Sequence, residues 1–235
     1  MGRCCTRRPV NDMSRDAPLT NFLQTRLRSG MRTCSHCRVT AADSADGALA
    51  RSQAARRRRV IDATLELAAG GGFDGVQMRD VAAEAGVALG TVYRYFESKE
   101  RLLLEANLEQ VDALRERISE RPPKGATAAD RVVDVLRRAT RAQTRRPEAT
   151  AAMVRALGSA RPEESDAVAR VSEAMTRIIT SAMHQGAATE RDRAVARVLS
   201  QVWLSSLIGW VGGVDGPEVV GDDLECAARM LITET

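Results

Sequence analysis

The chain is 235 residues long, 44% hydrophobic but only 3% aromatic, and it carries a formal net charge of +4. This length accommodates one or two domains with a sizeable core, and a composition poor in aromatic residues favours helices over strands. Five cysteines are too few for a disulfide framework in such a chain, and neither a secretory leader nor an apolar run of transmembrane length is evident, so we expect a cytoplasmic protein with no membrane partner.

The positive charge is concentrated near the N-terminus. Residues 1–50 contain 8 basic and 4 acidic residues, residues 51–100 contain 8 and 7, and residues 101–235 contain 19 and 20. A basic end on a nearly neutral body fits a protein that meets nucleic acid through one end. Residues 1–52 show no sustained periodicity, so we predict a disordered basic extension, for which a mis-assigned start of translation is one explanation.

The extension contains a CxxC pair, Cys34 and Cys37, with Cys4 and Cys5 upstream. Their spacing is irregular and no folded knuckle surrounds them, so we predict no metal site and no cofactor. A basic run, Arg56–Arg59, then leads into a first helix that ends at the glycines 70–72. We predict phosphate contacts from Arg57 and Arg58, with a solvated charged turn as the ordinary alternative.

A helix-turn-helix pattern follows at residues 76–99. Val81, Ala82 and Ala85 have helical spacing, Gly86 breaks the helix, and Val92 and Phe96 recur four residues apart. The second helix shows small residues, hydroxyls and one arginine to solvent, which suits close approach to DNA. Core packing is the alternative for its tyrosines. The predicted contacts of this helix are Leu89, Gly90, Thr91, Tyr93, Arg94 and Tyr95.

A dense resemblance covers Phe73 to Leu103, which read F-D-G-V-Q-M-R-D-V-A-x-x-A-G-V-A-x-G-T-V-Y-R-Y-F-x-S-K-E-x-L-L. This segment is similar to the N-terminal DNA-binding domain of the TetR family of repressors. The resemblance implies an all-α homodimer that binds palindromic operator DNA. Each subunit would have a helix-turn-helix domain at 53–99 and a ligand-binding and dimerisation domain at 100–235. It also implies a base contact for Arg79 and a phosphate contact for Lys99.

Gln77 departs from the Thr or Ser that commonly caps the second helix of this family, and glutamine caps poorly. We include it among the DNA-binding residues because it lies at the start of that helix. The sequence V-Q-M-R around Gln77 and the segment V-A-R-V-L-S-Q-V-W-L-S-S-L-I-G-W at 195–210 resemble the KstR-like branch of the family, which regulates sterol catabolism.

Six further helices are predicted, which gives about nine in all. They span 99–121, with Ser98 as its N-cap, then 127–145, 147–157, 162–186, 189–210 and 218–232. The last two are apolar around much of their circumference, so each should be buried on more than one side, by a dimer interface and by a ligand cavity. Ordinary core packing within a monomer is the alternative. The predicted ligand-binding residues are Leu104, Leu108, Met153, Leu157, Met175, Ile178, Trp203 and Leu207.

The sequence therefore predicts a repressor that a large apolar effector releases from its operator. The branch implies a sterol- or fatty-acid-derived acyl-CoA as that effector. A constitutive DNA-binding regulator without a small ligand and a drug-efflux regulator with a different ligand are the alternatives. An enzyme is not expected, because His36 and His184 are the only histidines and no nucleophile or phosphate-loop motif is present.

Overall fold

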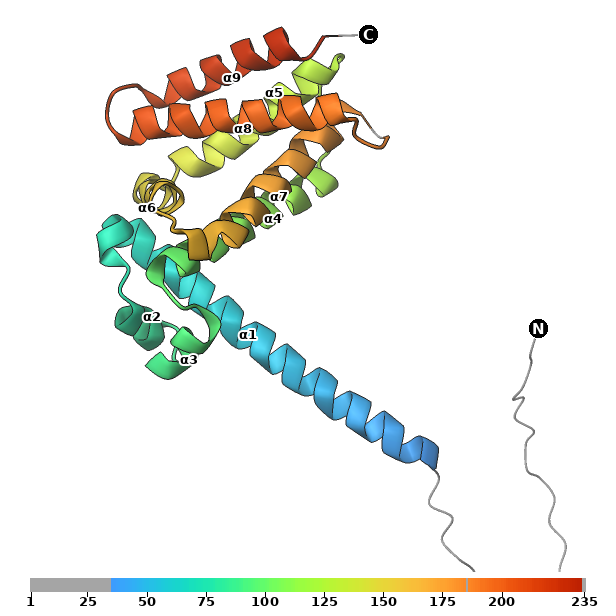
Figure 1. Ribbon diagram of the computed structural model, residues 1–235, viewed down its shortest axis with the longest axis vertical. Helices are drawn as coiled ribbons and strands as arrows, with labels where there is room; N and C mark the ends of the chain where they lie inside the picture. Colours follow the sequence, from blue (N-terminus) through green and yellow to red (C-terminus); the bar gives the residue numbers. More distant parts are fainter. Residues whose placement is uncertain (1–34, 185, 234–235) are drawn as a thin grey trace, which may run out of the picture. The chain divides into compact units, whose positions relative to one another are not determined.

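The computed structural model describes residues 35–184 and 186–233, and side chains from residue 47 onwards. Within these residues every regular element is helical, which confirms the predicted all-α class. The elements are α1 (Ser35–Gly75), α2 (Met78–Glu84), α3 (Leu89–Tyr95), α4 (Lys99–Glu120), α5 (Ala128–Thr144), α6 (Pro147–Gly158), the 3₁₀ turn η1 (Pro162–Glu164), α7 (Ser165–Met183), α8 (Glu190–Val211) and α9 (Pro217–Leu231) (Figure 1). The chain divides into two units, residues 1–45 and 46–235, and the second contains all the helices after α1.

Helix α1 begins earlier than the sequence predicted. Residues 35–52 were expected to be disordered, but they belong to this helix. Alanine is frequent in this segment and is the strongest helix former. Residues 1–34, which include Cys4, Cys5 and Cys34, lie outside the described part of the chain. At the other end, Gly71 and Gly72 leave helical geometry, with φ of −146° and +59°, so the predicted break is present as a kink.

The helix-turn-helix forms as predicted, with α2 and α3 packed on the last turns of α1. Val81, Val92 and Phe96 are at most 1% exposed, so one apolar face of each short helix is fully covered. Gly86 lies between the helices with φ of +62°, a conformation that favours glycine. The Arg59 side chain donates to the carbonyl of Ala85 at 3.3 Å, which fixes the end of α2 against α1.

The later helices begin at capping residues close to the predicted boundaries. Ser98 accepts a hydrogen bond from the backbone N–H of Arg101, and Thr127 forms a reciprocal capping box with Asp130. Thr189 does the same with Asp192 at the start of α8. Hydrogen bonds from the Thr189 hydroxyl, from His184 and from the Thr189 backbone lower the pKa of Asp192 to about 2.

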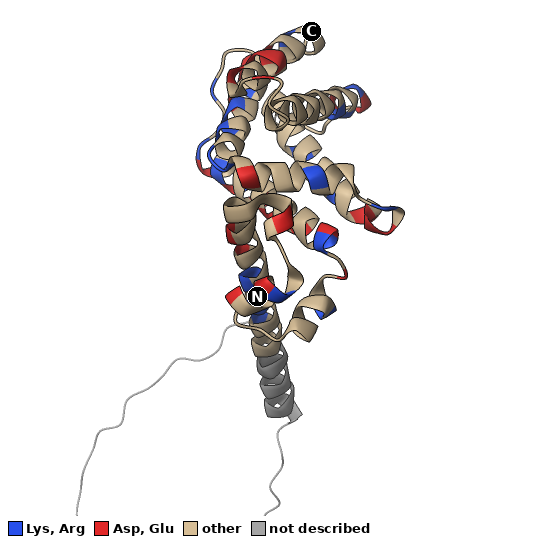
Figure 2. Ribbon diagram, turned by 90° about the vertical axis from the view of Figure 1, so that its left-hand side faces the viewer, with Lys and Arg blue, Asp and Glu red and all other residues tan. Residues whose placement is uncertain are grey.

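The helices after α3 form one bundle. Helices α4 and α7 lie side by side, as do α8 and α9, and α6 contacts both α4 and α8 (Figure 1). Acidic and basic residues are interspersed along these helices (Figure 2). Among the described helices, α8 meets the length and hydropathy test of a membrane span, with a mean hydropathy of 1.3, which the sequence analysis did not anticipate. Core helices of soluble proteins pass the same test; α8 packs on α6, α7 and α9, and 28% of its apolar stretch is buried.

Candidate DNA-reading surface and ligand cavity

The outer face of α3 has the features that the sequence predicted for a reader of DNA. Leu89 is 42% exposed and Tyr93 is 50% exposed, while Gly90 and Arg94 also face solvent. Thr91 is half-buried. A Cβ atom at Gly90 would meet no protein atom within 4 Å, so the fold does not require glycine there. Its missing side chain keeps the front of α3 flat.

The basic residues around α3 fall into two groups. Arg79 and Arg58 extend into solvent, with side chains 81% and 70% exposed. Arg57 is different, because it donates to the buried Glu105 at 2.6 Å and stacks over the ring of Phe96 at 5.4 Å. Arg57 is therefore half-buried and its charge is matched by Glu105, while its phosphate contact stays a prediction.

Three other predicted contacts are placed as follows. The hydroxyl of Tyr95 is buried and has no hydrogen-bond partner in the described chain, so the expectation that Tyr95 faces solvent is wrong. Lys99 donates to the carbonyl of Phe73 at 3.2 Å and lies 4.0 Å from its ring, which leaves it half-buried at the start of α4. Gln77 precedes α2 without capping it and donates to the carbonyl of Asp74.

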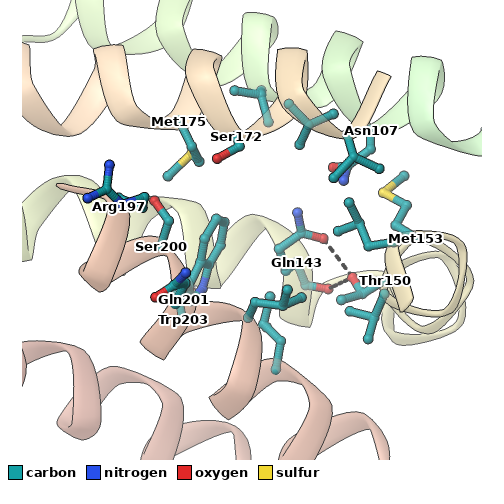
Figure 3. Close-up of a pocket in the computed structure, with 17 residues that line it drawn as sticks. Asn107, Gln143, Thr150, Met153, Ser172, Met175, Arg197, Ser200, Gln201 and Trp203 are labelled. Carbon is teal, nitrogen blue, oxygen red and sulfur yellow. Dashed lines mark hydrogen bonds between the residues drawn. The ribbon is translucent and has the colours of Figure 1, made fainter. Parts of the chain in front are cut away.

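A cavity of about 250 Å³ lies inside the bundle, between α4, α5, α6, α7 and α8. Most of its wall is apolar, and Trp203 stands along it (Figure 3). The indole N–H of Trp203 donates to Thr140 at 3.1 Å. Of the predicted ligand-binding residues, the wall contains Met153, Leu157, Met175, Trp203 and Leu207. The other three, Leu104, Leu108 and Ile178, are absent from it and belong to the packed cores around it.

Polar residues of the cavity wall were missed by the sequence analysis. Asn107 is 7% exposed and its amide has no protein partner among the described residues, while the Gln143 amide oxygen accepts from Thr150 at 2.8 Å (Figure 3). At the opposite end Arg197 and Gln201 are exposed at the cavity mouth. A mostly apolar pocket with a few convergent polar groups is typical of small-molecule sites. Only the helical register of Asn107, four residues before Val111, could have indicated this placement.

Helix α4 connects this cavity to the reading surface. Near its start, Glu105 accepts hydrogen bonds from Arg57 of α1 and from Arg170 of α7, and it pairs with Arg101 at 3.4 Å. Beside this cluster the Ser98 hydroxyl donates to the buried Glu164 at 2.9 Å. Within the next two turns of the same helix, Asn107 and Val111 line the cavity. The reader and the cavity therefore share one rigid element.

Comparison with known proteins agrees with this arrangement. Residues 60–106 match the bacterial regulatory proteins of the tetR family, and residues 125–231 match the tetracyclin repressor-like C-terminal domain. The transcriptional repressor KstR of Rhodococcus jostii is 40% identical over 181 residues, which cover 77% of this chain and 84% of the repressor.

Two solved structures are also similar. A TetR transcriptional regulator from Rhodococcus sp. RHA1 has a TM-score of 0.73 and 31% identity, over 77% of this chain and 98% of that one. The regulator FadR of Bacillus subtilis, crystallised in complex with stearoyl-CoA, has a TM-score of 0.58 and 20% identity, over 75% of this chain and 97% of that one. At this identity the second likeness concerns the fold.

Proposed function

Because this chain belongs to the TetR family of DNA-binding transcriptional regulators, we propose that it is a repressor that an acyl-CoA releases from a palindromic operator. The observation that carries the proposal is the shared helix α4. Near its start Glu105 accepts a hydrogen bond from Arg57 of α1, beneath the reader, and its middle lines an apolar cavity through Asn107 and Val111. A molecule that enters the cavity acts directly on the element that supports the reader.

In this proposal the front of α3 enters the major groove. Leu89, Gly90 and Thr91 would lie nearest the base edges, and Arg79 would read a base, since arginine to guanine is the commonest specific contact. Tyr93, Arg94, Lys99 and Arg58 would hold the phosphate backbone. The half-buried Arg57, paired with Glu105, and Tyr95, whose hydroxyl is buried, would have supporting roles beneath the reading surface.

The protein would act as a homodimer through α8 and α9. Several apolar residues of these helices remain exposed, among them Val198 at 39%, Ile208 at 53% and Met230 at 75%. Exposed apolar surface of this kind marks an interaction site. A two-fold dimer places two recognition helices one DNA turn apart, ~34–36 Å, and doubles the number of base contacts. This role fits a protein that works at the chromosome, in the cytoplasm.

The effector class rests on the cavity and on the relatives. The wall is apolar, and the Asn107 amide and the Gln143 amide N–H on it have no partner among the described residues, so it suits a hydrophobic chain or ring system that carries a carbonyl. The fold likeness to a regulator that binds stearoyl-CoA and the identity with KstR support a fatty-acid- or sterol-derived acyl-CoA. The effector would shift the dimer between two arrangements only by its differential affinity for them.

DNA binding to the protein's own upstream region tests the reader. We expect Arg79→Ala to relax sequence preference by about 1–3 kcal/mol at one base pair. Tyr93→Ala should weaken binding to all sequences alike, because it removes a phosphate contact. Glu190→Ala, on the exposed start of α8, is the control and should leave both properties unchanged. Weak, salt-sensitive binding that is indifferent to both reader variants would mean that the helix-turn-helix does not read DNA.

Gly90 gives a second, independent test. Gly90→Ala should stabilise the free protein by roughly 0.5–1 kcal/mol, because alanine is the better helix former and meets no neighbour. The same methyl group should weaken operator binding by obstructing close approach to the bases. Gly86→Ala is the matched control, since its φ of +62° makes alanine destabilising there. Unchanged operator affinity in Gly90→Ala would show that this surface does not approach DNA closely.

A constitutive regulator is the competing function, and thermal stability separates the two. Lauroyl-CoA should raise the melting temperature of the wild type, since a ligand that binds only the folded state stabilises it. A protein without an effector would show no shift with fatty or sterol acyl-CoA thioesters.

A further inference from the structure

The apolar cavity has an open end and a buried end. At the open end Arg197 and Gln201 of α8 are exposed to solvent (Figure 3). At the buried end Asn107 of α4 is 7% exposed and Thr150 of α6 is 2% exposed. An amphiphilic ligand keeps its charged head in water, because burying a charge without a partner is costly. The part of the ligand that is remote from its head group therefore lies at the buried end.

Two amide groups face the buried end of the cavity. The amide of Asn107 has no hydrogen-bond partner among the described residues, and Figure 3 shows it directed into the cavity. Gln143, at the end of α5, accepts a hydrogen bond from the Thr150 hydroxyl at 2.8 Å through its amide oxygen, which turns its amide N–H groups toward the cavity. Both side chains therefore offer N–H donors, and Asn107 also offers an acceptor, that no described residue uses.

Asn107 is an exception among the buried polar residues. Buried polar groups in folded proteins almost always have hydrogen-bond partners. The hydroxyls of Thr64 and Thr180 are buried as deeply, and each donates to a carbonyl of its own helix. A leucine in place of Asn107 would have the same branched outline and would bury no polar atom. Packing therefore does not explain the asparagine, whereas a ligand that completes its hydrogen bonds does.

We propose that Asn107 and Gln143 select an effector whose apolar body carries a ketone or hydroxyl oxygen at the end remote from its head group. This inference rests on the proposed function and names a feature that the effector must have. One such oxygen has two lone pairs and can accept from both amides. A plain hydrocarbon end would exclude water from the amides and leave them unpaired, so the site disfavours it. Because Asn107 belongs to α4, the same hydrogen bond joins the ligand to the helix that leads to the reader.

Calorimetric titration of the full-length protein with two matched pairs of thioesters tests this inference. Decanoyl-CoA and lauroyl-CoA are each compared with the same chain that carries a terminal hydroxyl. The test variant is Asn107→Leu, and Asn107→Gln retains an amide at the same position. The control is Thr180→Val, which also replaces a buried polar side chain by an apolar one of similar shape, but on α7 and outside the cavity wall.

The wild type and Thr180→Val should bind at least one hydroxylated chain about tenfold more tightly than its plain counterpart. Asn107→Leu should bind the plain chains at least as tightly as the wild type and should lose or reverse this preference, because the hydroxyl then lacks its partner. Asn107→Gln should retain part of the preference, which a merely structural role of Asn107 would not produce.

Two results would overturn the inference while the proposed function stands. One is the same ratio of affinities for hydroxylated and plain chains in the wild type and Asn107→Leu. The other is a wild type that binds the plain chain more tightly at both lengths. If the wild type bound none of the four thioesters, the proposed acyl-CoA effector would be rejected together with the selection by Asn107.

Discussion

The two halves of α4 differ in whether their apolar and charged side chains find partners within the described chain. In the first half Leu102, Leu103 and Leu104 have no exposed surface, and Glu105 is enclosed by three arginines. In the second half Val111 faces a cavity, and Arg117 and Arg121 have no carboxylate partner among the described residues. We call the first half closed, because its side chains have partners within the chain. We call the second half open, because it presents apolar surface and positive charge that a ligand would complement. A ligand would therefore bind at the open half, and the reader at the closed half would respond.

The largest expected effect comes from breaking the closed half. Glu105→Ala should lower the free energy of unfolding by about 1.5–3 kcal/mol, because it removes the charge-assisted hydrogen bonds that Arg57 and Arg170 donate to a buried carboxylate. Urea denaturation measures this. Arg177→Ala, which removes an exposed pair with Glu173, is the control and should change stability by under about 1 kcal/mol. A Glu105→Ala variant as stable as the control would mean that this cluster does not stabilise the first half of α4.

The same substitution in the filled core and in the cavity wall gives the sharpest comparison. Val81 of α2 lies in the core against which the first half of α4 packs, and Val81→Phe should cost about 1–3 kcal/mol, because close-packed interiors resist added volume. Val111→Phe has the cavity to grow into, so it should cost clearly less, under about 1 kcal/mol, while it blocks effector binding. Thermal denaturation and lauroyl-CoA titration of both variants test this. Equal destabilisation by the two substitutions would contradict the distinction between a filled core at Val81 and an open cavity at Val111.

The boundary of the two domains should respond more weakly. Ser98→Ala removes the N-cap of α4 and the partner of Glu164, which should cost about 1 kcal/mol in stability. Thr127→Ala removes a comparable cap from α5 in the open region and serves as the reference. If the Ser98 contact couples the domains, Ser98→Ala should also alter operator affinity and Thr127→Ala should not. Operator affinities that respond alike to both variants would reject the coupling.

The smallest effect concerns pH. The pKa of Asp192 is depressed to about 2 in the folded protein, against an ordinary value of 3.8. A depressed carboxyl pKa stabilises the fold above the unfolded value, and that stability is lost as pH falls from about 4 towards 2. Asp192→Asn should therefore flatten the dependence of melting temperature on pH in this window only. An unchanged slope would show that this cap at the start of α8 carries no such linkage.

Sequence reasoning succeeded where the signal is local. Helix boundaries followed from caps and prolines such as Ser98, Thr189 and Pro147, and the Gly86 turn followed from one residue type. It failed where a partner lies far along the chain. Nothing around Arg57 indicates that Glu105, 48 residues later, lies beneath it.

The candidate sites show the same division. The exposure of Leu89 and Tyr93 on α3 could be predicted from helical spacing alone. The Tyr95 hydroxyl could not be assigned correctly, because Val92 and Phe96 seemed to fill the inward positions of so short a helix. Leu104 and Ile178 have the same apolar character as the cavity residues, and only the packing of neighbouring helices decides which apolar residues meet a void.

Fluorescence anisotropy of the operator complex during an effector titration tests control of the reader through the cavity most directly. Lauroyl-CoA and a CoA thioester of a sterol side-chain acid would be added separately to wild type and Val111→Phe bound to the upstream palindrome. We predict that at least one thioester releases the wild type, while Val111→Phe stays bound because its cavity is filled. Release of both proteins at the same concentration, or of neither by any thioester, would contradict this control.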